Sequence, residues 1–165
     1  MKRTLLLALA LITVGCADPI PKNLDDLAQQ GDGYFDRETM GPYSGPVFRF
    51  FPDDTTRVQL RANLKNGVRD GPYKVYYENG QLSQKLTYVA GELYGPDDRY
   101  HENGQLEGKG TYVAGKLDGA FERYYENGQW AIKGKFNMGH QCGEWIEDGE
   151  TVTHNPCPPG PEDGN

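Results

Sequence analysis

The sequence lacks the residue combinations on which the common hydrolases and transferases depend. It holds only three histidines, no Gly-x-Ser-x-Gly motif, and no glycine-rich loop followed by Lys-Ser or Lys-Thr. Acyl transfer and phosphoryl transfer therefore lack their usual groups. Carboxylates are plentiful, but Glu78, Glu102 and Glu126 flank predicted turns, where acidic side chains are ordinarily solvated. The sequence predicts a protein that is not an enzyme, with no cofactor and no small-molecule substrate.

Positive charge is also scarce. Lys and Arg number 17 against 24 Asp and Glu, which gives a formal net charge of −7. An acidic surface repels the phosphates of nucleic acids and the headgroups of anionic lipids. We therefore expect no nucleic-acid partner, and we expect any membrane attachment to come from acyl chains.

One long apolar run is present, and it lies at the start of the chain. Lys2 and Arg3 precede the run Leu5–Val14, which is followed by Gly15 and Cys16. The run is too short to cross a bilayer as a helix, and this order is typical of an export signal. The small residue before Cys16 resembles the lipobox of bacterial lipoproteins, which implies that Cys16 is lipidated and becomes the first residue.

The alternative is ordinary signal cleavage after Ala17. Removal of residues 1–15 takes away two of the 17 basic residues, so that 15 remain against 24 acidic ones and the formal charge becomes −9. The resemblance to lipoproteins implies a bacterial cell envelope. Ala17 after the lipidated cysteine favours the outer membrane, facing the periplasm, in a Gram-negative cell.

A period of 24 residues organises the rest of the chain. Paired glycines recur in four copies, and Glu-Asn-Gly stands between them at 78–80, 102–104 and 126–128. The glycine pairs are Gly67/Gly71, Gly91/Gly95, Gly115/Gly119 and Gly139/Gly143. Such a period indicates supersecondary units that must stack on their neighbours to bury an apolar face.

Each unit is predicted to be a β-hairpin, because Asn-Gly is the strongest short signal for a two-residue type I′ turn. With Asn79 and Gly80 as the loop, Tyr77 lies opposite Leu82 and Tyr73 opposite Leu86. The same register places Phe121 opposite Gly134, where its ring could lie over the glycine backbone. The fold class is therefore all-β, with tandem antiparallel hairpins in an elongated, twisted, single-layer sheet.

The predicted organisation has four parts. Residues 1–15 form the lipoprotein signal, 16–33 a lipid-anchored tether, 34–152 the repeat domain and 153–165 a tail rich in proline and glycine. Asn23 is able to cap one helical turn within the tether. Neither end is expected to add to the core. One apolar face of the sheet must then be covered by curling, by the segment around Leu24 and Leu27, or by another molecule.

Two stretches carry a family resemblance. Tyr124–Gln129, followed by Gly-x-x-x-Gly from Gly139, and Gly108–Tyr112 resemble the MORN repeat, above all its bacterial variant. The resemblance runs from Gly41 to about Trp145. It implies a single layer of antiparallel hairpins that binds rather than catalyses. Some bacterial members are labelled antitoxin or immunity components, and this role is one option for the chain.

The predicted register gathers a candidate binding surface on the solvent side. Tyr76, Tyr100 and Tyr124 form one column, and tyrosine offers apolar area with a hydrogen-bonding tip. The alternative is that tyrosine occurs at these positions only because it favours the β-strand conformation and covers the backbone of an open sheet. Asp98 and Asp97 complete the candidate surface. Asp97 marks either a local bend or a contact point, or it is an exposed acidic residue at the start of a strand. We expect the partner to be a protein.

The same register predicts charge pairs on the solvent side. Asp98 lies opposite Lys109 and Glu122 opposite Lys133, each pair worth a few tenths of a kcal/mol. Lys74 opposite Lys85 breaks the pattern.

Cys142 and Cys157 are candidates for a disulfide, which an oxidising compartment favours and which would tie the tail to the last unit. Free thiols are one alternative. A zinc site is the other, with His140 and His154 as further ligands, although the spacing matches no familiar zinc motif. The disulfide is the interpretation adopted, and no bound metal is predicted.

Together these features predict an exported bacterial lipoprotein whose repeat sheet is a protein-binding module. The alternative function is a structural scaffold of the cell envelope that acts by repeat stacking or self-association.

Overall fold

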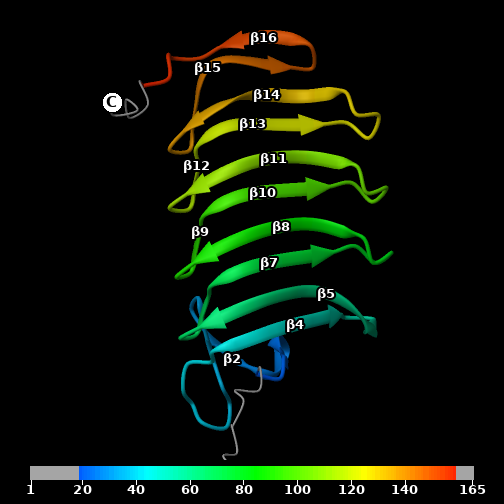
Figure 1. Ribbon diagram of the computed structural model, residues 1–165, viewed down its shortest axis with the longest axis vertical. Helices are drawn as coiled ribbons and strands as arrows, with labels where there is room; N and C mark the ends of the chain where they lie inside the picture. Colours follow the sequence, from blue (N-terminus) through cyan, green and yellow to red (C-terminus); the bar gives the residue numbers. More distant parts are fainter. Residues whose placement is uncertain (1–18, 159–165) are drawn as a thin grey trace, which may run out of the picture.

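The computed structural model describes residues 19–158, which form an elongated sheet one layer thick (Figure 1). In this range the main sheet has 14 strands, and a small sheet pairs β2 with β3. Successive long strands pair antiparallel with their neighbours in chain order, while β1 pairs parallel with β4. The predicted all-β architecture of tandem hairpins is confirmed.

The elements have the following bounds. The small elements near the start are β1 (Lys22–Asn23), the 3₁₀ helix η1 (Leu24–Asp26), β2 (Ala28–Gln30) and β3 (Gly33–Phe35). The strands that form the main sheet together with β1 are β4 (Gly45–Phe51), β5 (Asp54–Lys65), β6 (Val68–Arg69), β7 (Gly71–Tyr76), β8 (Leu82–Val89), β9 (Glu92–Leu93), β10 (Gly95–Tyr100), β11 (Leu106–Val113), β12 (Lys116–Leu117), β13 (Gly119–Tyr124), β14 (Trp130–Asn137), β15 (His140–Glu147) and β16 (Glu150–Thr153).

The Asn-Gly corners reverse the chain, but not as two-residue type I′ turns. The Tyr77 N–H donates to the Gln81 carbonyl (2.8 Å), and the Gly80 N–H donates to the Tyr77 carbonyl (2.9 Å). Gly80 has φ 83°, whereas Asn79 is not among the residues with positive φ. The loop therefore has three residues and consists of a type I turn completed by a glycine in the left-handed conformation. The predicted turn type was wrong.

The longer loop shifts the register at one end of each hairpin only. Tyr73 lies opposite Leu86 as predicted, but a bulge after Val75 brings Tyr76, not Tyr77, opposite Leu82. The hairpin of β13 and β14 repeats this pattern, with Tyr124 opposite Trp130.

Two-residue type I′ turns occur at the other ends of the units, inside the paired-glycine segments. Ala90 and Gly91 have φ 50° and 91°, and Ala114 and Gly115 have 47° and 75°. Positive φ at both positions is the requirement for this turn. The Gly91 N–H then donates to the Arg69 carbonyl of the preceding unit (2.8 Å), so each such turn is bonded to the unit before it.

The two faces of the sheet differ in their cover. The side of the sheet that bears Leu60, Tyr73 and Trp145 is called the inner face. The side that bears Tyr76 and Tyr124 is called the outer face. At the N-terminal end, residues from η1 to β3 pack on the inner face. The resulting core consists of Leu24, Leu27, Tyr34, Val47, Leu60, Ala62 and Leu64, each no more than 7% exposed.

The prediction that residues 16–33 form a tether outside the core was therefore wrong from β1 onward. Leu24 and Leu27 supply the cover that the apolar face of an open sheet requires. Asn23 caps η1 as predicted, because its side chain accepts a hydrogen bond from the Asp25 N–H (3.1 Å).

At the C-terminal end, Trp145 fills the inner face and is 1% exposed. A Cβ placed on Gly134 would lie 2.2 Å from the indole, so the ring lies directly on the glycine backbone. Phe121 is opposite Gly134 in register as predicted, but its ring covers Gly110, 3.2 Å from a Cβ placed there. Trp145, and not Phe121, therefore packs on Gly134.

The start of the tail adds to this end. A disulfide joins Cys142 and Cys157, with Sγ atoms 2.03 Å apart. The His154 ring packs edge-on against Trp145, with centroids 6.0 Å apart. The prediction that the tail adds nothing to the core was wrong for His154, which packs on the buried Trp145.

Between residues 19 and 158, no helix has the length and apolar character needed to span a bilayer.

Candidate functional site

One row of side chains crosses the middle of the outer face from strand to strand. Its members are successive partners in the sheet register. They are Phe48, Arg61, Lys74, Lys85, Asp98, Lys109, Glu122 and Lys133. We call this set the charge row.

The C-terminal half of the charge row alternates in sign. Asp98 lies opposite Lys109 and Glu122 opposite Lys133, as predicted. The ionic contact, however, joins Lys109 to Glu122 of the next hairpin, with Nζ to Oε2 at 3.1 Å. The Tyr124 hydroxyl also donates to Glu122, and this bond, followed by the Lys109 contact, lowers the pKa of that carboxyl. In return, the bond to Glu122 raises the pKa of Lys109.

The N-terminal half has one sign only. Arg61 lies opposite Lys74, and Lys74 lies opposite Lys85. Within residues 19–158, none of these three cations has a carboxylate oxygen within ion-pair distance, although Lys85 has Asp98 as its register partner on the far side. Like charges directly across strands are destabilising by a few tenths of a kcal/mol, so this arrangement is a cost to the fold.

The three predicted tyrosines lie beside the charge row at the ends of β7, β10 and β13. Tyr76, Tyr100 and Tyr124 are each partly exposed, so that ring area remains open to solvent. The structure thus brings them together on the outer face with Asp98.

The strand ends that bear these tyrosines are held by contacts that sequence reasoning missed. The Tyr77 hydroxyl donates to the Tyr100 carbonyl (2.7 Å), and Nε2 of His101 lies 2.9 Å from the Tyr124 carbonyl oxygen. The Tyr125 hydroxyl donates instead to the side-chain carboxylate of Asp148. The 24-residue spacing of 77, 101 and 125 was the available signal. These contacts fix the column of tyrosines relative to the sheet.

Asp97 does not belong to this surface. It is 5% exposed, and it accepts a hydrogen bond from the Gln84 Nε2 (2.9 Å) and forms an ion pair with Arg99 (3.1 Å). Its register partner is Gly110, whose missing side chain leaves room on the inner face. Both predictions for Asp97, an exposed strand start and a member of the binding surface, were wrong.

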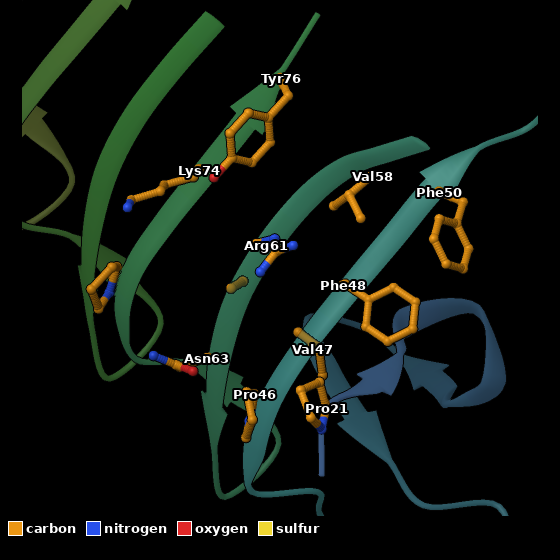
Figure 2. Close-up of a pocket in the computed structure, with 12 residues that line it drawn as sticks. Pro21, Pro46, Val47, Phe48, Phe50, Val58, Arg61, Asn63, Lys74 and Tyr76 are labelled. Atoms are coloured by element: carbon orange, nitrogen blue, oxygen red, sulfur yellow. The ribbon is translucent and has the colours of Figure 1, made fainter. Parts of the chain in front are cut away.

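A groove of about 580 Å³ opens on the outer face at the N-terminal end of the sheet. Figure 2 shows side chains of β4, β5 and β7 along it, with Arg61 between Phe48 and Lys74 and with Tyr76 further along the strand that bears Lys74. Its lining consists of Pro21, Pro46, Val47, Phe48, Phe50, Val58, Arg61, Ala62, Asn63, Pro72, Lys74 and Tyr76. No carboxylate is among these lining residues from the described part of the chain.

A smaller hollow of about 280 Å³ lies on the inner face around Gly108. Arg99 and Arg123 are the register partners of Gly108 on its two sides. Each guanidinium already has a carboxylate, since Arg123 pairs with Glu107 (3.3 Å) and Arg99 with Asp97. The charges of this hollow are balanced within the chain.

Cys142 and Cys157 are bonded to each other. Both sulfurs of Cys142 and Cys157 are in the disulfide, so neither is available there as a thiolate ligand. Across residues 19–158, no three His, Cys, Asp or Glu side chains are grouped to hold a metal ion. Cys16, the predicted lipidation site, lies outside the described residues.

The geometry defines a class of protein: an open repeat sheet that offers broad surfaces built from stacked hairpins. The comparison with family models agrees, because residues 69–90, 99–114 and 117–137 match the model described as the MORN repeat variant. The resemblance to the MORN repeat seen in the sequence is therefore confirmed for these three segments. No curated protein matches the chain.

Proposed function

We propose that the protein is a binding module that presents its outer face to a partner protein. The observation that supports this most is the column of partly exposed rings of Tyr76, Tyr100 and Tyr124 beside the charge row. Tyrosine combines apolar area with a hydroxyl and is enriched at the centres of interfaces. The inter-unit bonds described above keep the column in one arrangement, which limits the entropy lost on binding.

The test is replacement of all three tyrosines by serine, followed by quantitative pull-downs from cells of the source organism. We expect loss of one defined partner with the fold retained, as judged by circular dichroism. A matched control replaces three exposed side chains near the type I′ turns, Val89, Tyr94 and Met138, by serine. If the tyrosine variant keeps the partner, or the control loses it equally, the tyrosine column is not the binding surface.

We also propose that the protein is an exported lipoprotein acylated on Cys16. The basic, apolar and small residues before Cys16 support this, and the Cys142–Cys157 disulfide suits an oxidising compartment. Labelled palmitate should enter the wild-type protein and not Cys16→Ser. Equal labelling of the two would refute acylation at this site. Fractionation of a Gram-negative host should place the protein in the outer membrane.

An immunity-type role is the more specific form of the binding proposal. It is supported by the likeness to bacterial MORN-variant proteins alone. A toxin gene adjacent to this gene, whose toxicity is relieved by the wild-type protein and not by the triple tyrosine variant, would establish it. Relief by both proteins would show that the outer face is not involved.

A scaffold role is the second candidate, and one observation favours it. All four residues of β16, the last strand of the main sheet, are exposed. An open edge can pair with another chain. Sedimentation of the mature chain at rising concentration would show growing assemblies if this were the function, whereas a monomer throughout would eliminate it.

A further inference from the structure

Arg61, Lys74 and Lys85 have no carboxylate oxygen within ion-pair distance among residues 19–158, and Arg61 and Lys74 line the groove. We propose that the outer-face groove binds an extended, acidic peptide segment of the partner protein. This rests on the proposed function, and it names the chemistry that the N-terminal half of the surface recognises.

The charge argument comes from the contrast between the two halves of the charge row. Where the row alternates, Lys109 has its carboxylate in Glu122 at 3.1 Å. Arg61 and Lys74 have none among the described residues, and both line the groove. An acidic ligand would supply the missing carboxylates and relieve the repulsion between neighbouring cations. A chain with net charge −7 concentrates positive charge here.

The spacing fits a short extended segment. Adjacent strands lie about 4.8 Å apart, so Arg61 and Lys85, two strands apart, are separated by about 10 Å along the row. An extended chain advances about 3.3 Å per residue, so roughly three residues cover this distance. Side chains on alternate residues face the same way and lie about 7 Å apart, so two carboxylates of one segment would face the row of three cations.

The apolar lining favours a peptide over other anions. Phe48, Phe50 and Tyr76 flank the cations, and Pro21 and Pro72 also line the groove. A peptide offers apolar side chains to these surfaces together with its carboxylates, whereas a phosphate backbone offers charge alone. The remaining acidic surface opposes broad contact with nucleic acid or an anionic bilayer.

The experiment uses the mature chain and two fluorescent peptides, Pro-Glu-Phe-Glu-Pro-Glu and its analogue with glutamine at each glutamate. We expect the acidic peptide to bind more tightly than the analogue, with affinity that falls as NaCl is added. Replacing Arg61, Lys74 and Lys85 by glutamine should weaken the acidic peptide about tenfold. The control replaces Lys109, Lys116 and Lys133 by glutamine, and it should change the affinity less than about twofold.

Three results would overturn the inference: equal binding of the two peptides, equal loss in the two triple variants, or binding of phosphatidylglycerol vesicles that competes with the peptide and needs the same cations. A charge swap provides a second check, since Lys74→Glu should favour a lysine-containing analogue. If the peptide fails while the triple tyrosine variant still loses its partner, the proposed function stands and this inference alone falls.

Discussion

Gly134→Ala is the substitution that most directly tests how this thin sheet is stabilised. A Cβ at this position would lie 2.2, 2.3 and 2.6 Å from three indole atoms of Trp145. The indole cannot move away freely, because its N–H donates to the Cys142 carbonyl (3.2 Å) and its ring packs edge-on against Phe136, with centroids 5.0 Å apart. Overpacking of a buried site costs about 1–3 kcal/mol, and contacts this short place the variant near the upper end.

The assay is urea unfolding of the oxidised protein, followed by Trp145 fluorescence in a Trp130→Phe background. We expect a loss of about 3 kcal/mol, which corresponds to roughly 6–12 °C in Tm. Gly41→Ala is the matched control, because only Thr39 Oγ1 lies within 4 Å of a Cβ there, at 3.5 Å. It should change stability by less than about 0.5 kcal/mol.

A double-mutant cycle with Trp145→Leu separates the clash from other effects of the added methyl group. If the indole causes the loss, Gly134→Ala should cost much less in the Trp145→Leu background, with a coupling of about 1 kcal/mol or more. A Gly134→Ala protein as stable as its parent, or a cycle with no coupling, would refute the claim that the ring rests on this glycine.

Three further outcomes follow from the structure. Ala114 has φ 47° at the first position of a type I′ turn, so Ala114→Asn should raise the free energy of unfolding by about 1 kcal/mol in urea titrations, and an unchanged midpoint would contradict this turn geometry. The disulfide closes 15 residues, so replacing Cys142 and Cys157 by serine should cost about 3 kcal/mol, measured against the oxidised parent. Hydrogen bonds from the Lys22 ammonium and from the Thr39 and Glu38 N–H groups lower the pKa of Asp36 from 3.8 to about 2, so the stability that this carboxylate provides is present above about pH 4 and declines as the pH falls toward 2. In pH-dependent melting, Asp36→Asn should remove this decline.

The repeat period determined most of what could be predicted about the fold. Glycines at fixed spacing and Asn-Gly corners imply hairpins, and the strand bodies are long enough that pairs such as Tyr73 with Leu86 are set correctly even when the loop is misjudged. The loop type itself could not be read from the sequence, because Asn-Gly suits a type I turn with a left-handed glycine as well as a type I′ turn. The difference changes only the pairs next to the loop.

Prediction of the candidate site was limited by tertiary contacts, namely side-chain contacts between strands and the packing of other segments on the sheet. Tyr76, Tyr100 and Tyr124 could be placed because side chains alternate between faces along a strand. The burial of Asp97 depends on Gln84 and Arg99, which reach it from the same face, and no pattern of period two reveals such a contact. The cover supplied by Leu24 and Leu27 is likewise tertiary, since a short polar segment with two leucines is indistinguishable from a linker.

The bonds between units have a consequence for how long this protein can be. Gly91, Gly115 and Gly139 donate to the carbonyls of Arg69, Leu93 and Leu117, so successive junctions are made by equivalent backbone atoms. A 24-residue block that begins at one junction and ends before the next can therefore be duplicated or deleted. The units that become adjacent would then be joined by the same backbone hydrogen bond. Chain length thus becomes adjustable in whole blocks, and related genes of different size would differ by multiples of 24 codons.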